Sequence, residues 1–129
     1  MIGGIVLTHG QIGAALIDAA ASILGEIDNI SALSTANLSF LDINAKLNQV
    51  IATQNKKCGT IVMVSLKGGS CWNSALALAR QLPKIEVVSG VNLTMLISFL
   101  SKRDRFSLSE LATIVKEDGI RGIDRFTIK

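Results

Sequence analysis

The sequence has little of several features that would point to a specialised class of protein. Only 4% of its 129 residues are aromatic, 18% are charged, and there is a single proline. Two cysteines, Cys58 and Cys71, cannot build a disulfide scaffold, and their spacing matches no zinc motif. Because unpaired thiols fit a reducing compartment, we expect a cytoplasmic protein.

Long hydrophobic runs and strong charge are also missing. No apolar run approaches the roughly 18–20 residues of a membrane-spanning helix, and the first residues lack the basic stretch of a signal peptide. Thirteen basic and ten acidic residues give a net charge of only +3. Since these charges are scattered and not interleaved with aromatic side chains, we expect no nucleic-acid partner.

The chain does have apolar residues in regular patterns. They make up 49% of the sequence, which excludes disorder and, at this length, indicates one domain spanning residues 1–129. Short runs rich in β-branched residues predict buried strands at 4–8, 29–33, 59–66 and 85–89. Apolar residues at helical spacing predict helices at 12–24, 40–51, 72–82, 93–100 and 107–116.

The order of these elements defines the fold class. Alternating strands and helices predict an α/β protein with three α/β/α layers around a mainly parallel sheet in the order 2-1-3-4. Gly119 and Gly122 are expected to end the last helix. The segment from Asp124 to Lys129 alternates in hydrophobicity. We therefore expect a final antiparallel edge strand, exchanged within a homodimer, because an exposed sheet edge needs cover.

A single candidate nucleophile lies at the expected binding crevice. Open α/β sheets bind ligands at the carboxyl ends of their strands, where the strand order reverses. In the order 2-1-3-4 that point lies between strands one and three, so the loop after Thr8 should face the loop from Ser65 to Ser70. His9, the only histidine, lies in the first of these loops. A lone histidine is more often structural, but neutral imidazole is also a nucleophile. Because no second histidine and no paired carboxylates lie nearby in the sequence, we do not expect a metal site.

The second loop has the composition of an anion cradle. Gly68 and Gly69 let the backbone approach an anion closely, and Ser70 leads into a helix whose first amides could hold phosphate oxygens. An ordinary turn with Ser70 as the helix cap would explain the same residues. A nucleophile facing an anion cradle indicates phosphoryl transfer. No Walker motif supports ATP binding, and we expect no cofactor.

Three segments of the chain resemble a known family. They read Ile-Val-Leu-Thr-His-Gly at 5–10, Gly-Gly-Ser followed by Asn73 at 68–73, and Ser-Gly-Val-Asn-Leu-Thr-Met-Leu at 89–96. In this order they resemble the mannose-type IIA domains of the bacterial phosphoenolpyruvate-dependent sugar phosphotransferase system (PTS). The resemblance implies a phosphotransferase in which His9 accepts a phosphoryl group from the histidine phosphocarrier protein. It also implies transfer to a IIB component that serves a membrane permease.

The same resemblance implies roles for the second loop. Ser70 and the amides of Gly68 and Gly69 would hold the phosphoryl group, and Lys67 could screen its charge. Ser65 stands where the family usually has an aspartate that orients the imidazole, and it would take over that role. Two other interpretations stay open. One is a divergent regulatory or partner-binding module of the same fold with weak or no phosphotransfer, and the other is a small-ligand domain that uses the crevice as a pocket.

Overall fold

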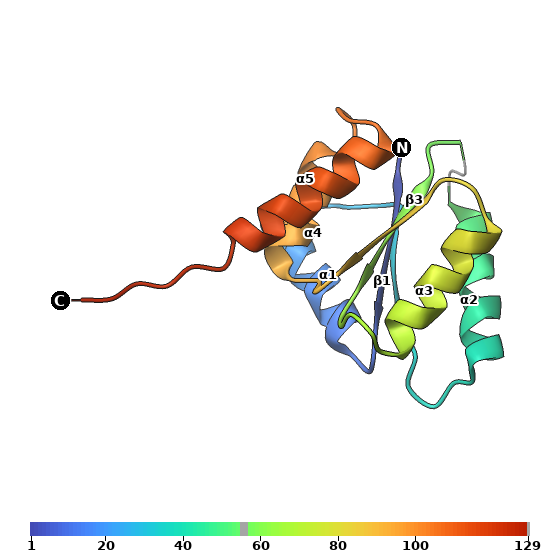
Figure 1. The fold of residues 1–129 in the computed structure, drawn as a ribbon. Coiled ribbons are helices and arrows are strands. Elements are labelled where there is room, and N and C mark those ends of the chain that lie inside the picture. Colours follow the sequence, from blue (N-terminus) through green and yellow to red (C-terminus); the bar gives the residue numbers. More distant parts are fainter. Residues whose placement is uncertain (55–56, 129) are drawn as a thin grey trace.

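The computed structural model describes residues 1–54 and 57–128 and confirms the predicted fold class. A four-stranded parallel sheet in the order β2-β1-β3-β4 forms the middle layer (Figure 1). Its strands are β1 (Gly3–Thr8), β2 (Ile30–Ser34), β3 (Thr60–Val64) and β4 (Ile85–Ser89). The helices are α1 (Ile12–Leu24), α2 (Phe40–Thr53), α3 (Ser70–Gln81), α4 (Leu93–Lys102) and α5 (Leu108–Arg121).

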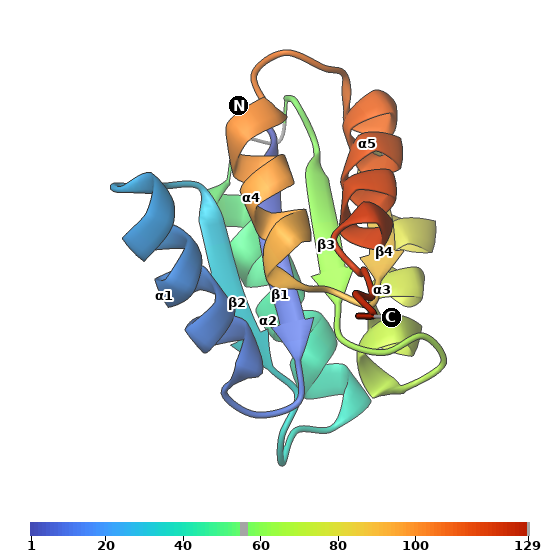
Figure 2. The same cartoon turned by 90° about the vertical axis from the view of Figure 1, so that its left-hand side faces the viewer.

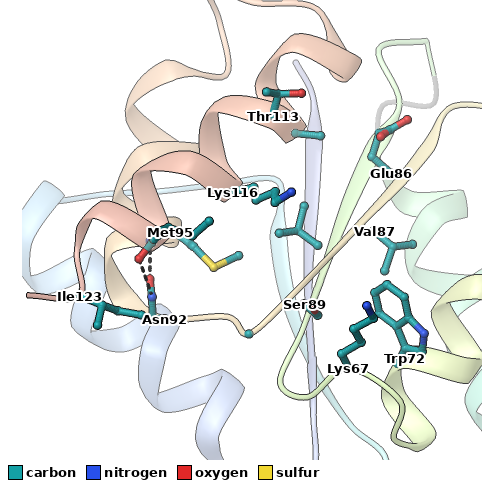
Figure 3. A pocket seen from close by; sticks show the side chains of 15 residues that line it. Lys67, Trp72, Glu86, Val87, Ser89, Asn92, Met95, Thr113, Lys116 and Ile123 are labelled. Atoms are coloured by element: carbon teal, nitrogen blue, oxygen red, sulfur yellow. Dashed lines mark hydrogen bonds between the residues drawn. The ribbon is translucent and has the colours of Figure 1, made fainter.

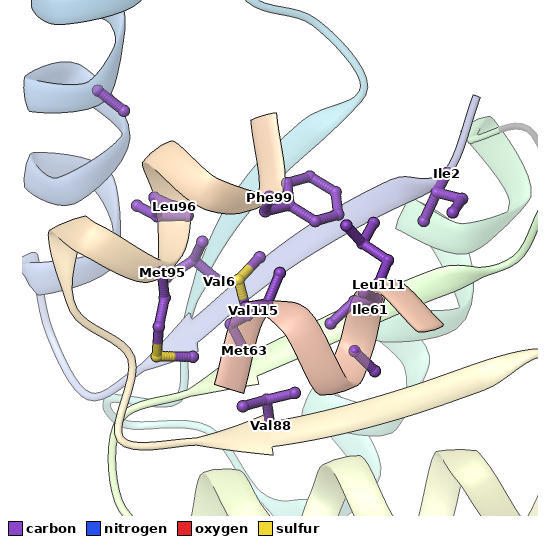
Figure 4. Packing of buried hydrophobic residues seen from close by; sticks show 12 residues of the cluster. Ile2, Val6, Ile61, Met63, Val88, Met95, Leu96, Phe99, Leu111 and Val115 are labelled. Atoms are coloured by element: carbon purple, nitrogen blue, oxygen red, sulfur yellow. The ribbon is translucent and has the colours of Figure 1, made fainter. Parts of the chain in front are cut away.

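Helices cover both faces of the sheet. α1, α4 and α5 pack over one face, while α2 and α3 pack over the other (Figure 2). Alternate strand residues serve the two cores: Val6 and Met63 belong to the first (Figure 4), and Leu7 and Val64 to the second. Every residue of β1 and β3 is buried for this reason, which explains their continuous apolar sequences. None of the helices in the described ranges has the length and hydrophobicity to cross a membrane.

Polar caps fix where three of the helices begin. Ser39 Oγ accepts a hydrogen bond from the Asp42 N–H ahead of α2. Ser107 and Glu110 form a reciprocal capping box ahead of α5, and Asn92 caps α4. Each cap gives an acceptor to a helix amide that would otherwise lack one. The caps thereby determine where the preceding loops join these helices.

The last helix runs further than its sequence predicts. α5 continues to Arg121, and Gly119, which we expected to end it, lies buried inside it. A Cβ at Gly119 would collide with the Met95 side chain of α4. The glycine therefore allows two helices to pack closely and does not terminate one of them. The prediction for Gly119 is wrong, whereas Gly122 is the C-cap as expected.

The segment after α5 forms no strand in the isolated chain. Residues 123–128 run away from the body of the domain in a non-helical conformation (Figure 1), and Lys129 lies outside the described residues. A strand needs a neighbour with which to exchange hydrogen bonds, and within the described residues this segment pairs with none. β4 is left as an open edge of the sheet. The exchange of this segment between two subunits stays a prediction.

Candidate active site

His9 lies at the carboxyl end of β1, in the loop that leads to α1. Its side chain is exposed, and it makes no hydrogen bond or ion pair with the described residues. Gly10 follows with φ +83°, a left-handed conformation that glycine adopts without strain. No three potential metal ligands come together in the described part of the chain. The imidazole is thus open to a partner that approaches from solvent.

Hydrogen bonds hold the backbone on either side of His9. The Thr8 carbonyl accepts from the Thr35 N–H at 2.9 Å, and the Thr8 hydroxyl accepts from an amide in the first turn of α1 at 3.0 Å. After the histidine, the Gly10 N–H donates to Ser34 Oγ at 2.9 Å. Sequence reasoning missed Ser34 and Thr35. The predicted strand order was a signal that could have found them, because it places the end of β2 beside the His9 loop.

The loop between β3 and α3 leaves the amides of Gly68 and Ser70 without an acceptor among the described residues, whereas the Gly69 N–H donates to the Leu66 carbonyl at 3.4 Å. Gly68 has φ +88° and open space where a side chain would lie. Gly69 is the N-cap of α3 and no side chain caps the helix, so Ser70 is the first helical residue and not the cap. The first amide bonded within the helix is that of Asn73, to the Gly69 carbonyl at 3.0 Å. An uncapped helix N-terminus of this kind favours an anion.

The sheet brings these two loops to the same edge. β1 and β3 are adjacent and parallel, with Leu7 paired to Val64, and the Ser65 N–H donates to the Leu7 carbonyl at 3.3 Å. Both strands end at the lower edge of the sheet in Figure 2, where the two loops begin. The edge lies where the strand order reverses, which is the usual ligand position in such folds.

Ser65 lies at this edge with its hydroxyl directed toward Cys71. Ser65 Oγ is 4.0 Å from the buried Cys71 Sγ, and Thr35 Oγ1 is 3.6 Å from the same sulfur. Within residues 1–54 and 57–128, no hydrogen bond joins Ser65 to His9. Polar groups that follow β2 and β3 therefore meet at a thiol of α3, beneath the two loops.

Lys67 lies on the side of the loop that faces β4. Its side chain is beside Trp72 at one end of a groove of about 560 Å³ that follows the open edge of β4 (Figure 3). Ser89, Asn92 and Lys116 also line this groove. The structure thus places Lys67 between the glycine-rich loop and the groove, and it shows no hydrogen bond from Lys67 to another described residue.

Comparison with known proteins identifies the class to which this site belongs. The family model described as "PTS system fructose IIA component" matches residues 3–116. Such proteins are IIA components of the sugar phosphotransferase system, a class of phosphoryl carriers. The chain belongs to this EIIA-man family, which confirms the predicted mannose-type IIA domain.

Individual relatives and solved structures agree with this assignment. The chain is 29% identical over 112 residues to the sorbose-specific EIIA component of Klebsiella pneumoniae, covering 86% of this chain and 82% of that one. It is 29% identical to the mannose-specific EIIAB component of Escherichia coli K12, covering 97% of this chain but only 39% of that longer protein. Its fold matches an EIIA component from Streptococcus agalactiae with a TM-score of 0.89 at 24% identity, over 97% of each chain. A mannose/sorbose-specific IIA subunit from Enterococcus faecalis matches with a TM-score of 0.84 at 24% identity, over 99% of this chain and 96% of that one.

Proposed function

We propose that the protein is a phosphohistidine carrier. His9 accepts a phosphoryl group from the histidine phosphocarrier protein and passes it to a IIB component, which in turn supplies sugar uptake through a membrane permease. The observation that carries the proposal is the position of the only histidine, exposed at the carboxyl end of β1 and on the same sheet edge as an uncapped helix N-terminus. The proposed reaction requires no metal or organic cofactor. We propose that it takes place in the cytoplasm.

The transfer exchanges one nitrogen–phosphorus bond for another. Nε2 of the neutral His9 imidazole attacks phosphorus, the bond from phosphorus to the donor's histidine breaks, and its electron pair returns to the donor imidazole. His9 keeps its proton on Nδ1 and carries the phosphoryl group until the nucleophile of IIB attacks phosphorus in turn. Because the protein has little covalent chemistry to perform, positioning and electrostatics dominate the rate.

The glycine-rich loop would hold the phosphoryl oxygens. The amides of Gly68 and Ser70, together with the Ser70 hydroxyl, offer donors at the positive end of α3, and the Gly69 amide would join them by releasing the Leu66 carbonyl, to which it donates at 3.4 Å. Open space at Gly68 leaves room for an anion to reach the backbone. Lys67, exposed in the same loop, would attract the oxygens as a point charge.

The environment of Ser65 favours a second candidate function. In the carrier, the Ser65 hydroxyl would orient the imidazole of His9, and for this it must turn away from Cys71 Sγ, which it faces at 4.0 Å. A regulatory or partner-binding module of the same fold, with weak or no phosphotransfer, would not need that turn. The two functions differ in whether His9 takes up phosphate, which is directly measurable.

Intact-mass spectrometry tests the carrier proposal. Incubation with phosphoenolpyruvate, the general phosphotransferase enzyme and the histidine phosphocarrier should add one phosphate in an acid-labile, base-stable bond. His9→Ala should stay unmodified, while Gln11→Ala, an exposed neighbour in the same loop, should behave like the wild type. A phosphate on His9→Ala would assign the acceptor elsewhere. A wild-type protein without phosphate would favour the regulatory module.

We also infer a homodimer in which the segment 123–129 is exchanged. β4 leaves a sheet edge unpaired, and the groove of about 560 Å³ runs along it. Ile123, Phe126 and Ile128 are 76–86% exposed in the isolated chain. An antiparallel strand from a second copy would pair with β4 and bury these side chains. Light scattering should find a dimer that weakens when residues 123–129 are deleted, and a monomeric full chain at micromolar concentration would contradict the exchange.

A further inference from the structure

Ser34 links the end of β2 to the turn that carries His9. Ser34 is the last residue of β2, is half-buried, and pairs with Thr8 in the register of β1 and β2. Its Oγ accepts hydrogen bonds from the Gly10 N–H at 2.9 Å and from the Ala36 N–H at 3.1 Å. A hydroxyl oxygen has two acceptor positions, so both are occupied. One side-chain atom therefore joins two turns at the candidate active site.

Little else fixes the turn after His9. The imidazole makes no hydrogen bond with the described residues, so its place depends on its backbone and its rotamer. Apart from the two neighbouring residues, nothing lies within 4 Å of where a side chain at Gly10 would begin, so packing does not hold the turn either. The hydrogen bond to Ser34 is the one that the structure shows for the Gly10 amide.

The other hydrogen bonds of this loop act elsewhere. The Thr35 amide holds the carbonyl of Thr8, before the histidine, and the Thr8 hydroxyl holds the Gly13 amide at the start of α1. Neither reaches the residue directly after His9. Among these residues, Ser34 is therefore the one whose side chain bonds to the backbone directly after His9.

We propose that Ser34 is a positioning residue for phosphoryl transfer, holding the Gly10 turn so that His9 is directed at the incoming phosphoryl group. This inference rests on the proposed carrier function. Without the Ser34 hydroxyl, the turn loses its acceptor and the imidazole spends less time in the reactive geometry. A displacement of about 1 Å at a reacting group can cost about a hundredfold in rate. Ser34 is half-buried and its hydroxyl bonds to backbone amides of this protein. Its loss should therefore slow the transfer without weakening the binding of the donor.

Rapid-quench kinetics of phosphorylation by the phosphorylated histidine phosphocarrier would test this role. Rates measured over a range of donor concentrations separate the maximal rate from the apparent Kd. Ser34→Ala should lower the maximal rate about tenfold or more, with the apparent Kd unchanged. Ser34→Thr keeps the acceptor oxygen and should restore the rate. Ser31→Ala removes a hydroxyl of the same strand that bonds to none of the described residues, and should match the wild type.

Amide hydrogen exchange, followed by NMR in the unphosphorylated protein, gives a second readout. The Gly10 and Ala36 amides should exchange faster in Ser34→Ala and should keep their wild-type rates in Ser31→Ala. A wild-type transfer rate in Ser34→Ala, an equal loss in Ser31→Ala, or unchanged Gly10 exchange would each overturn the inference alone. A wild-type protein that accepts no phosphate would overturn the carrier function as well, and this is seen before any variant is compared.

Discussion

At the amino-terminal edge of the sheet, buried side chains pair with backbone groups of the strands, whereas at the carboxyl edge the candidate reactive groups are exposed. The side chain of Arg103 is 5% exposed and donates to the carbonyls of Ile2, Asp28 and Asn29, which precede β1 and β2. At the opposite edge the imidazole of His9 has no partner among the described residues, and the first amides of α3 have no side-chain cap. Buried side chains thus join the strands at the amino-terminal edge, whereas the carboxyl edge presents the accessible groups that the proposed function uses.

Gln54, at the end of α2, shows the same difference between the two edges of the sheet. It follows α2 and is buried at the amino-terminal edge, where its Nε2 donates to the Gly4 carbonyl at 2.9 Å and its Oε1 accepts from Thr60 Oγ1 at 3.1 Å. This one side chain therefore ties β1 to β3 where both strands begin. No comparable buried side chain of the described residues bridges the two strands at the His9 edge, where the Ser65 N–H bonds to the Leu7 carbonyl but the Ser65 hydroxyl faces Cys71.

The largest expected effect on stability separates the two edges. Arg103→Met removes the donor to the Ile2 and Asp28 carbonyls and the ion pair with the Asp28 carboxylate, whereas the Asn29 carbonyl keeps its bond from the Gly4 N–H. The change should lower the free energy of unfolding by about 2–3 kcal/mol. It should leave the rate of phosphorylation unchanged below the melting transition. Urea denaturation measures the first quantity and intact-mass kinetics the second. A loss of phosphorylation in the folded variant would show that the two edges of the sheet do not act independently.

Arg105→Met is the matched control for that variant. Arg105 is exposed and lies 5.8 Å from the centre of the Phe106 ring, and it makes no ion pair within the described residues. Its replacement should cost about 0.5 kcal/mol or less. Equal losses in the two variants would show that burial of Arg103 at the sheet edge contributes nothing special.

A smaller effect is expected at Ser65, on the carboxyl edge. Phosphorylated imidazole is positively charged, and a carboxylate partner stabilises that charge with a hydrogen bond about twice as strong as a neutral one. Ser65→Asp should therefore raise the phosphorylated fraction at equilibrium with the donor by about tenfold, which corresponds to about 1.4 kcal/mol. Ser65→Asn introduces a side chain of the same shape as aspartate but without its charge, and it should change the phosphorylated fraction little. Intact-mass measurement at fixed donor concentration decides, and equal fractions in all three proteins would place Ser65 out of reach of His9.

The ionic cluster between α4 and α5 should give the smallest effect, on stability alone. Asp118 is 15% exposed and accepts hydrogen bonds from Lys102 at 2.6 Å, Ser98 at 2.6 Å and Arg121 at 2.8 Å. These bonds, that of Lys102 first, hold the pKa of Asp118 well below its usual range. The charged groups of this cluster are paired, as Arg103 is at the amino-terminal edge, but they are partly open to solvent. The cluster therefore tests how much burial adds to the stability that a charged pair contributes.

The lowered pKa fixes the direction of the pH dependence. Because the carboxyl group binds its proton less readily in the folded state, it adds stability above the unfolded pKa of about 3.9 and loses it as the pH falls below that value. Asp118→Asn should cost about 1 kcal/mol at pH 7, and its difference from the wild type should shrink at pH 3. Urea unfolding at both pH values measures this. Glu117→Gln removes an exposed carboxylate that makes no ion pair with the described residues, and it should cost less stability at pH 7 than Asp118→Asn.

The elements that local patterns encode could be predicted from the sequence. β1 and β3 are continuous apolar runs, and Ser107 with Glu110 defines the start of α5, so near neighbours decide both features. The prediction for Gly119 was wrong because a tertiary contact, with the Met95 side chain of another helix, requires a glycine there. The alternating segment at 124–128 has the pattern of a strand but lies beside no sheet edge in one chain.

The candidate site divides in the same way. His9 and the glycine-rich loop could be predicted because each directly follows a recognisable strand. Ser34 could not be singled out by local pattern, since its role arises from the register that pairs it with Thr8. The direction of the Ser65 hydroxyl depends on Cys71, a residue of the following helix. Local sequence thus identifies the reactive groups, and the residues that position them emerge only from strand pairing and packing.

His9 is proposed to carry the phosphoryl group, and the NMR signals of its ring nitrogens would show whether it does. As the only histidine, it gives unambiguous imidazole signals in a uniformly ¹⁵N-labelled protein. When phosphoenolpyruvate, the general phosphotransferase enzyme and the histidine phosphocarrier are added, the Nε2 signal should move and show coupling to ³¹P, while Nδ1 keeps its proton. Unchanged His9 ring signals in the presence of fully phosphorylated phosphocarrier would contradict the account.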